Sequence, residues 1–264
     1  MHNDSSKRRQ TLMEFQRPSH ASLRRFAPIL ILVISVFGTS IPANAETANC
    51  VVLLHGLWRT DNSMEPLQEA FEARGYAVAN VAYPSRKQPI EPLADAAVKK
   101  GLERCREISK GHIHFVTHSL GGILIRYYLA RHKVVDLGRI VMIAPPNKGS
   151  QAVDNLKRIP GFELLMGPAA LQLGTGPNDI PAQLGPAEYP VGIIAGTDSL
   201  NPILSQYLPN PDDGKVSVSS TRLAGMRDFI TLPVSHAFIM RDETAIRQAI
   251  AFIKTGKFER NEQS

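Results

Sequence analysis

The sequence predicts an α/β protein built on one mostly parallel sheet with helices on both faces. From residue 50 onward, short runs of apolar and β-branched residues alternate with longer segments whose apolar residues recur at helical spacing. This alternation is typical of βαβ units, in which each helix crosses the sheet so that neighbouring strands run parallel. The chain has 264 residues, of which 43% are hydrophobic, and these suffice for one substantial core.

The predicted elements follow in chain order. Strands are expected at the short apolar runs that end in turn residues, namely 50–56, 76–84, 112–118, 138–145 and 190–196. Helices are expected where apolar residues form one stripe, namely 63–74, 91–108, 120–132 and 243–254. The span 145–189 is rich in Pro, Gly and Leu, and its helical signal is weak after Pro160. We expect it to form a cap-like or lid-like excursion over one end of the sheet rather than a separate domain.

Residues 1–45 have the pattern of a secretory signal peptide. Two arginines precede the apolar run FAPILILVISVFG, and an A-x-A cleavage site follows at residues 43–45. The run is shorter than the roughly 20 residues of a membrane-spanning helix. We therefore expect a mature single domain, 46–264, that is periplasmic or secreted. An uncleaved leader that anchors the protein in a membrane is the alternative.

The charge of the chain gives no case for nucleic-acid binding. Residues 1–45 carry six Lys or Arg and two Asp or Glu, so only +2 of the net charge of +6 belongs to the mature chain. A nucleic-acid partner would require a clustered basic face, which this balance does not indicate.

The mature chain contains two cysteines, Cys50 and Cys105. In an oxidising compartment they can pair, provided that their Cα atoms lie close enough. The sequence leaves open whether they form a disulfide or remain two buried thiols.

The stretch FVTHSLGG, residues 115–122, places Ser119 between a predicted strand and a predicted helix. This arrangement is typical of a nucleophile elbow, because Gly121 and Gly122 permit a tight turn and the helix N-terminus directs N–H groups toward the hydroxyl. Thr117 stands where the G-x-S-x-G pattern has glycine, and we expect the neighbouring strand to accommodate it. A purely helix-capping serine is the alternative.

A nucleophilic serine needs a histidine base, and in proteins with this turn the chain order is Ser, acid, His. Of the eight histidines, only His132 and His236 follow Ser119. His132 lies on the helix that Ser119 opens, about 20 Å along its axis. Elimination therefore leaves His236, in LPVSHAF before the last helix, as the predicted base, with a surface-loop histidine as the alternative.

The backbone N–H groups of Leu57 and Leu120 are the predicted donors of an oxyanion hole. Leu120 directly follows the serine, and Leu57 follows the turn His55-Gly56 at the end of the first strand. The neighbouring Trp58 suits either an acyl pocket or ordinary packing.

Five segments carry a resemblance to a known family: VVLLHGL, FVTHSLGG, APPNKGS, DDGKVSV and SHAF. They resemble the α/β-hydrolase superfamily, and most of all its small bacterial lipases and the lipase-like proteins related to the inositol-deacylase group. The resemblance covers nearly all of the mature chain and implies ester hydrolysis through an acyl-serine without a cofactor. Because the mature chain begins at the strand before His55-Gly56, the two opening strands of larger hydrolases are expected to be missing, which predicts a minimal α/β-hydrolase fold.

Two carboxylates compete for the position of the acid. Asp198 comes directly after the strand 190–196, where the fold needs a carboxylate. Asp213 has the local sequence that the resemblance favours, with a small residue and then a valine after the acid, and Gly214 permits a sharp turn toward His236. We predict Asp213 as the acid, keep Asp198 as the alternative, and expect the adjacent Asp212 to be solvated or to form the turn.

The sequence favours a serine carboxylester hydrolase that acts on lipid or acyl esters, since the apolar excursion 145–189 suits a mobile lid. A thioesterase or amidase would use the same triad, and a non-catalytic binding module would lack a triad member. The expected partner is a small-molecule or lipid ester, which is compatible with transient contact with a membrane surface. His112 and His114 alternate on one strand but have no third ligand nearby, so no metal site is predicted. The sequence leaves the oligomeric state open.

Overall fold

The computed structural model describes residues 48–200 and 202–260, all within one compact unit of the chain. The predicted signal peptide lies outside the described residues and stays a prediction. Within the described ranges, no helix is both long and apolar enough to cross a membrane.

Six parallel strands form a single sheet in the order β2-β1-β3-β4-β5-β6. The strands are β1 (Cys50–Leu54), β2 (Ala77–Val81), β3 (Ile113–His118), β4 (Leu137–Ile143), β5 (Val191–Gly196) and β6 (Asp228–Leu232). Every residue of β1, β3 and β5 is buried, as expected for parallel strands that are covered on both faces. The predicted α/β class with a mostly parallel sheet is therefore confirmed.

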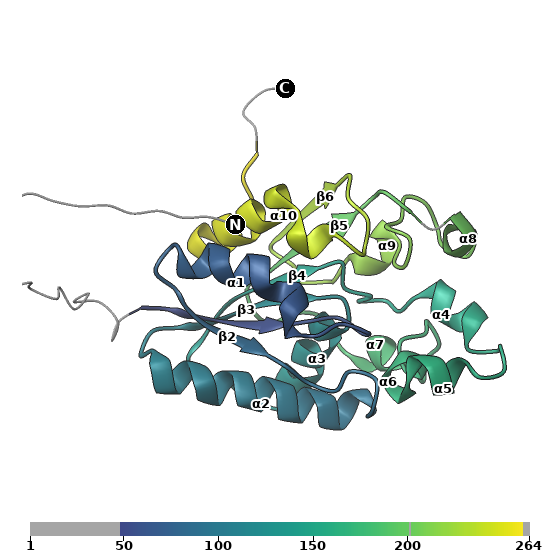
Figure 1. The fold of residues 1–264 in the computed structure, drawn as a ribbon, viewed down its shortest axis with the longest axis horizontal. Coiled ribbons are helices and arrows are strands. Elements are labelled where there is room, and N and C mark those ends of the chain that lie inside the picture. The colour runs from purple at the N-terminus through teal and green to yellow at the C-terminus, as the bar shows by residue number, and fades with distance from the viewer. Residues whose placement is uncertain (1–47, 201, 261–264) are drawn as a thin grey trace, which may run out of the picture. The chain divides into compact units, whose positions relative to one another are not determined.

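Helices cover both faces of this sheet (Figure 1). The principal ones are α1 (Glu65–Glu72), α2 (Ile90–Ile108), α3 (Leu120–Leu129) and α10 (Glu243–Thr255). Side chains alternate along β1, so that Val52 and Leu54 join the core beneath α2 and α3, whereas Val51 and Leu53 join the core beneath α1 and α10. Burial on both sides holds the strand ends in fixed positions.

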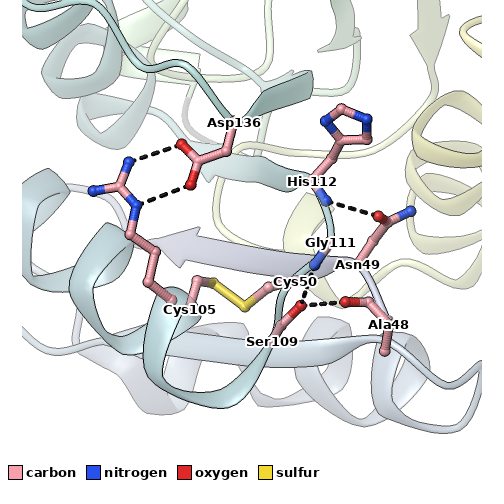
Figure 2. The surroundings of a disulfide bond; sticks show 9 residues. Ala48, Asn49, Cys50, Cys105, Ser109, Gly111, His112 and Asp136 are labelled. Atoms are coloured by element: carbon pink, nitrogen blue, oxygen red, sulfur yellow. Dashed lines mark hydrogen bonds and ion pairs between the residues drawn. A yellow bond between two sulfur atoms is a disulfide. The ribbon is translucent and has the colours of Figure 1, made fainter. Parts of the chain in front are cut away.

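A disulfide joins Cys50, the first residue of β1, to Cys105 in the last turn of α2 (Figure 2). The Cα atoms lie 5.6 Å apart, within the range that a disulfide spans, and both residues are fully buried. Nearby, Ser109 donates its hydroxyl proton to the carbonyl of Ala48, and His112 N–H donates to Asn49 Oδ1 at 2.9 Å. The disulfide and these bonds fasten the amino end of β1 to the turn between α2 and β3, which answers the question that the sequence left open.

The structure differs from the sequence prediction in two regions. Strand β6 was not predicted, and it pairs with β5 at the edge of the sheet. The excursion 145–189 contains four short helices, three of them after Pro160 where helical signal was weak: α4 (Gln151–Leu156), α5 (Phe162–Met166), α6 (Pro168–Leu171) and α7 (Ile180–Gln183). Helices of four to six residues carry too few apolar repeats to show a helical period. In Figure 1, α4 to α7 gather at one end of the sheet.

The remaining segments are short. They are η1 (Asp61–Met64), α8 (Pro202–Ser205), α9 (Val218–Thr221) and η2 (Ile239–Arg241).

Candidate active site

Ser119 lies at the carboxyl edge of the sheet, between the last residue of β3 and the first residue of α3. Its backbone has φ 51° and ψ −117°, a conformation that residues other than glycine rarely adopt. Two backbone bonds hold the turn: Ser119 N–H donates to the Ile143 carbonyl at 2.9 Å, and Gly122 N–H donates to the Ser119 carbonyl at 2.9 Å. Such a strained turn raises the serine hydroxyl above the strand end, as a nucleophile elbow requires.

Two glycines are required because other parts of the chain approach them closely. A Cβ atom on Gly121 would lie 2.5 Å from the Leu54 carbonyl oxygen, and one on Gly56 would lie 2.8 Å from His118 Nδ1. The elbow and the loop after β1 therefore pack directly against each other. Thr117 is fully buried, and its hydroxyl group is 3.4 Å from the Val141 carbonyl oxygen of β4, so the neighbouring strand accommodates it as expected.

The structure brings Ser119, His236 and Asp213 into one continuous chain of hydrogen bonds. His236 Nε2 lies 3.0 Å from Ser119 Oγ, and His236 Nδ1 lies 2.7 Å from Asp213 Oδ2. All three residues are at most 9% exposed. They come from three different segments, which follow β3, β5 and β6. The contact to the carboxylate assigns the proton of neutral His236 to Nδ1 and leaves Nε2 free to accept the serine proton.

The loop after the acid holds its carboxylate in place. Asp213 Oδ1 accepts the N–H groups of Lys215 at 3.0 Å and Val216 at 2.8 Å. Gly214, which lies between Asp213 and Lys215, has φ 92°. The other oxygen is thereby directed to the histidine. The alternative acid, Asp198, is exposed and makes no hydrogen bond or ion pair within the described ranges.

Asp212 was expected to be solvated or to form the turn, and the structure shows the second of these. It is only 2% exposed. Its Oδ1 accepts the Gly214 N–H at 2.7 Å and the Ser205 hydroxyl at 2.8 Å, so it forms the turn from a buried position.

The predicted oxyanion donors flank the serine. Leu120 is the first residue of α3, and Leu57 lines the same pocket as Ser119. Among the residues that the structure describes, neither N–H has a hydrogen-bond partner. Both are therefore available to an oxygen that gains negative charge above Ser119.

His118 is a buried neighbour that the sequence argument did not single out. It is 1% exposed, its ring centroid lies 4.8 Å from that of His236, and neither of its ring nitrogens has a partner in the described part of the chain. Burial lowers the pKa of His118 well below its usual value, and the positive charges of Arg59 and Lys215 add to the effect. The ring of His118 is consequently neutral beside His236.

A pocket opens above Ser119 and His236 and is lined mainly by apolar side chains of the excursion. These include Val153, Leu156, Phe162, Met166, Ala170 and Leu173. Arg59, Lys215 and Trp58 also line this pocket. Arg59 and Lys215 were missed from the sequence, although each lies two residues after a predicted site residue, Leu57 and Asp213 respectively.

No group of three or more potential metal ligands lies together within the described ranges. His114, one of the two histidines considered above, accepts the N–H of Arg139 through Nδ1 at 2.8 Å. Burial lowers its pKa to about 4, and the positive charge of Arg139 contributes.

Comparison with known proteins agrees with this architecture. Residues 51–254 match the family described as "Alpha/beta hydrolase family". No curated protein matches the chain by sequence at a significant level.

Several solved structures share the fold. The mature form of Bacillus licheniformis lipase BlEst2 is similar with a TM-score of 0.63 and 18% identity, over 82% of this chain and 94% of that chain. Phospholipase PlaB of Legionella pneumophila is similar with a TM-score of 0.57 and 19% identity, over 79% of this chain and 59% of that chain. A metagenomic carboxyl esterase gives a TM-score of 0.55 and 19% identity, over 76% of this chain and 69% of that chain.

At these identities the structural likeness concerns the fold. The family match spans well over half of the sequence, and the strand order, elbow and loops described above fit it. The chain therefore belongs to the alpha/beta hydrolase family.

Proposed function

We propose that the protein is a serine hydrolase that cleaves carboxylic esters of lipids or other acylated alcohols through an acyl-serine intermediate. The observation that carries the proposal is the unbroken contact from Ser119 Oγ through the His236 ring to Asp213 Oδ2. A serine, a histidine and a buried carboxylate in this order are the parts of a nucleophilic triad.

In the first half of the reaction, Ser119 Oγ attacks the ester carbonyl while its proton passes to His236 Nε2. Asp213 keeps the imidazole oriented and stabilises the positive charge that develops on it. The N–H groups of Leu57 and Leu120 donate to the negatively charged oxygen of the tetrahedral intermediate. His236 then returns the proton to the leaving alcohol, and the acyl group remains on Ser119.

In the second half, His236 accepts a proton from a water molecule that attacks the acyl-serine. The tetrahedral intermediate uses the same two N–H donors and collapses as His236 returns the proton to Ser119 Oγ, which releases the carboxylic acid and regenerates free Ser119. Neutral His118 beside the base supports this cycle, because a second positive charge there would oppose protonation of His236.

The pocket supports an acyl substrate with an apolar chain. Helix α5 contributes Phe162 and Met166 to the pocket, one helical turn apart. The same helix exposes Leu164 to 90% and Leu165 to 58%. A short helix that is apolar both inward and outward is suited to act as a lid that contacts lipid.

Export from the cytoplasm is part of the proposal. The signal-peptide pattern of residues 1–45 motivates it, and the Cys50–Cys105 disulfide is consistent with it, because disulfides persist in oxidising compartments. Mass spectrometry of the exported protein should find its N-terminus at Glu46. An intact leader would contradict cleavage.

The test of the activity is a series of chromogenic esters with increasing acyl length, measured for wild type and Ser119→Ala together. Ser119→Ala should lower turnover by several powers of ten, and His236→Ala by a similar amount, with little further loss in the double variant. Matched thioester and amide substrates show which acyl linkage is preferred. A fluorophosphonate probe should label Ser119 in the wild type, and equal turnover by wild type and Ser119→Ala would end the enzyme proposal.

A further inference from the structure

Two positively charged side chains line the pocket beside the triad. Arg59 comes from the loop after β1, and Lys215 comes from the loop that carries Asp213. Arg59 Nη2 donates to the Ala237 carbonyl oxygen at 3.1 Å, which fixes the guanidinium next to His236. Both charges are thus attached to the segments that form the catalytic geometry.

These two cations lack a carboxylate partner. No ion pair to either one occurs within the ranges 48–200 and 202–260. Asp213, the nearest carboxylate to influence Lys215, already accepts two backbone N–H groups and contacts His236. Arg59 has five N–H donors, and its hydrogen bond to the Ala237 carbonyl uses one of them.

The two charges also act on each other. Lys215 is exposed. Even so, the surrounding protein partly desolvates its ammonium group and lowers its pKa, and the positive charge of Arg59 lowers the pKa further. Two like charges held at one pocket without a counter-ion oppose each other. An anion between them would remove that repulsion and accept N–H groups from both side chains.

The position of the cations indicates which half of an ester they meet. His236 returns its proton to the alcohol oxygen, so the alcohol leaves on the histidine side of the site. Arg59 is anchored beside His236, and Lys215 lies two residues from Asp213. The same pocket is also lined by apolar side chains of the excursion, Phe162 among them, which suit the acyl chain.

We propose that Arg59 and Lys215 select esters whose alcohol half carries an anionic group, a phosphate monoester or diester, close to the scissile bond. This inference rests on the hydrolase activity proposed above. A guanidinium binds phosphate oxygens through paired N–H donors, and a lysine adds a compact charge, so together they suit a tetrahedral anion with several oxygens.

The chemistry at the ester is unchanged by this selection. Ser119 Oγ bonds to the acyl carbon, the carbonyl carbon–alcohol oxygen bond breaks, and the phosphorylated alcohol leaves with the proton from His236. Water then releases the carboxylic acid. No bond to phosphorus forms or breaks, and the phosphate serves only for recognition.

The experiment compares two soluble esters below their micelle concentration, 1-octanoylglycerol 3-phosphate and 1-octanoylglycerol. Wild type should show the higher kcat/KM on the phosphorylated ester, by about tenfold or more, since one charge-assisted hydrogen bond is worth about that factor. Arg59→Gln and Lys215→Gln should each lower the ratio of kcat/KM on the phosphorylated ester to kcat/KM on the neutral ester by about tenfold. Arg59→Lys should retain part of the preference, and Lys215→Glu should reverse it.

The exposed Lys133, four residues after α3 ends, supplies the matched control, and Lys133→Gln should leave both rates unchanged. Thermal melts identify any variant that has lost its fold. In that case the preference for the phosphorylated ester is tested with the conservative Arg59→Lys and with a salt titration of the wild type. Salt should weaken the preference for the phosphorylated ester.

The sources of the anion are separated by adding glycerol 3-phosphate or inorganic phosphate as competitors. Stronger inhibition by glycerol 3-phosphate supports recognition of the alcohol half, whereas equal inhibition by inorganic phosphate would indicate a general anion site and overturn the assignment. Equal wild-type rates on the two esters, or equal losses on both esters in the Gln variants, would also overturn it. Ser119-dependent turnover without a preference would refute this inference alone, whereas turnover independent of Ser119 would refute the proposed function.

Discussion

Breaking the Cys50–Cys105 disulfide should lower stability strongly without changing the chemistry of the site. The bond closes a loop with a sequence separation of 55. Restricting an unfolded loop of that length corresponds to about 4 kcal/mol at 25 °C on the chain-entropy account. For a domain of this size, about 4 kcal/mol corresponds to a melting temperature lower by roughly 8–16 °C.

The catalytic rate of the folded, reduced protein should stay close to that of the oxidised protein. Cys50 begins β1, whereas the triad lies beyond the carboxyl ends of the strands, roughly 16 Å away along a five-residue strand. Loss of the disulfide should therefore lower the melting temperature and leave turnover nearly unchanged.

The assay is a thermal melt of oxidised and reduced wild type. Reduction keeps both side chains in the core, so the difference between the melts reports the loss of the S–S bond alone. Both residues are fully buried, so reduction should be carried out in denaturant, followed by refolding in reductant. The double variant Cys50→Ala/Cys105→Ala serves as the control, since its melt should not respond to reductant. Equal melting temperatures for oxidised and fully reduced protein, with two titratable thiols in the latter, would refute the reasoning.

Three further predictions concern the site and the core. Asp213→Asn should retain the fold in a thermal melt yet lower kcat by about 10⁴, whereas Asp198→Asn should stay within a few-fold; the opposite ranking would reassign the acid. Gly121→Ala should reduce stability by about 1–3 kcal/mol in denaturant unfolding, because its Cβ would lie 2.5 Å from the Leu54 carbonyl oxygen, and an unchanged midpoint would show that the elbow can relax. Because the pKa of His114 is about 4 when folded, the unfolded chain binds a proton first as pH falls below about 6.5. His114 should therefore contribute a loss of stability of about 3 kcal/mol between pH 6.5 and 4, and His114→Gln should reduce the loss over that range by about this amount.

The main features of the fold and site could be predicted because they depend on local chemistry and chain order. A serine between a predicted strand and two glycines that open a predicted helix indicates the elbow. His236 was found by chain order, as the histidine left after elimination, and Gly214 marked the turn that directs Asp213. The signals for Ser119 and Asp213 lie within a few residues of them, whereas the signal for His236 is its order in the chain.

The features that were missed depend on packing between distant segments. Strand β6, DFITL, is only partly buried and begins with a charged residue, so its pattern resembles that of a loop. The turn formed by Asp212 was among the expectations, but its burial was not, because it also depends on the hydroxyl of Ser205 seven residues earlier. Arg59 and Lys215 meet at one pocket only because the loops after β1 and β5 converge there.

The direction in which β1 enters the sheet has a practical consequence for handling the protein. Ala48 lies just ahead of Cys50, at the amino edge of the sheet, whereas Ser119 lies at the carboxyl edge. A bead, chip or partner domain joined through a short linker ahead of Ala48 would therefore be attached at the edge opposite the pocket. Immobilisation by that route would leave the pocket facing the bulk solution, where substrate can reach it.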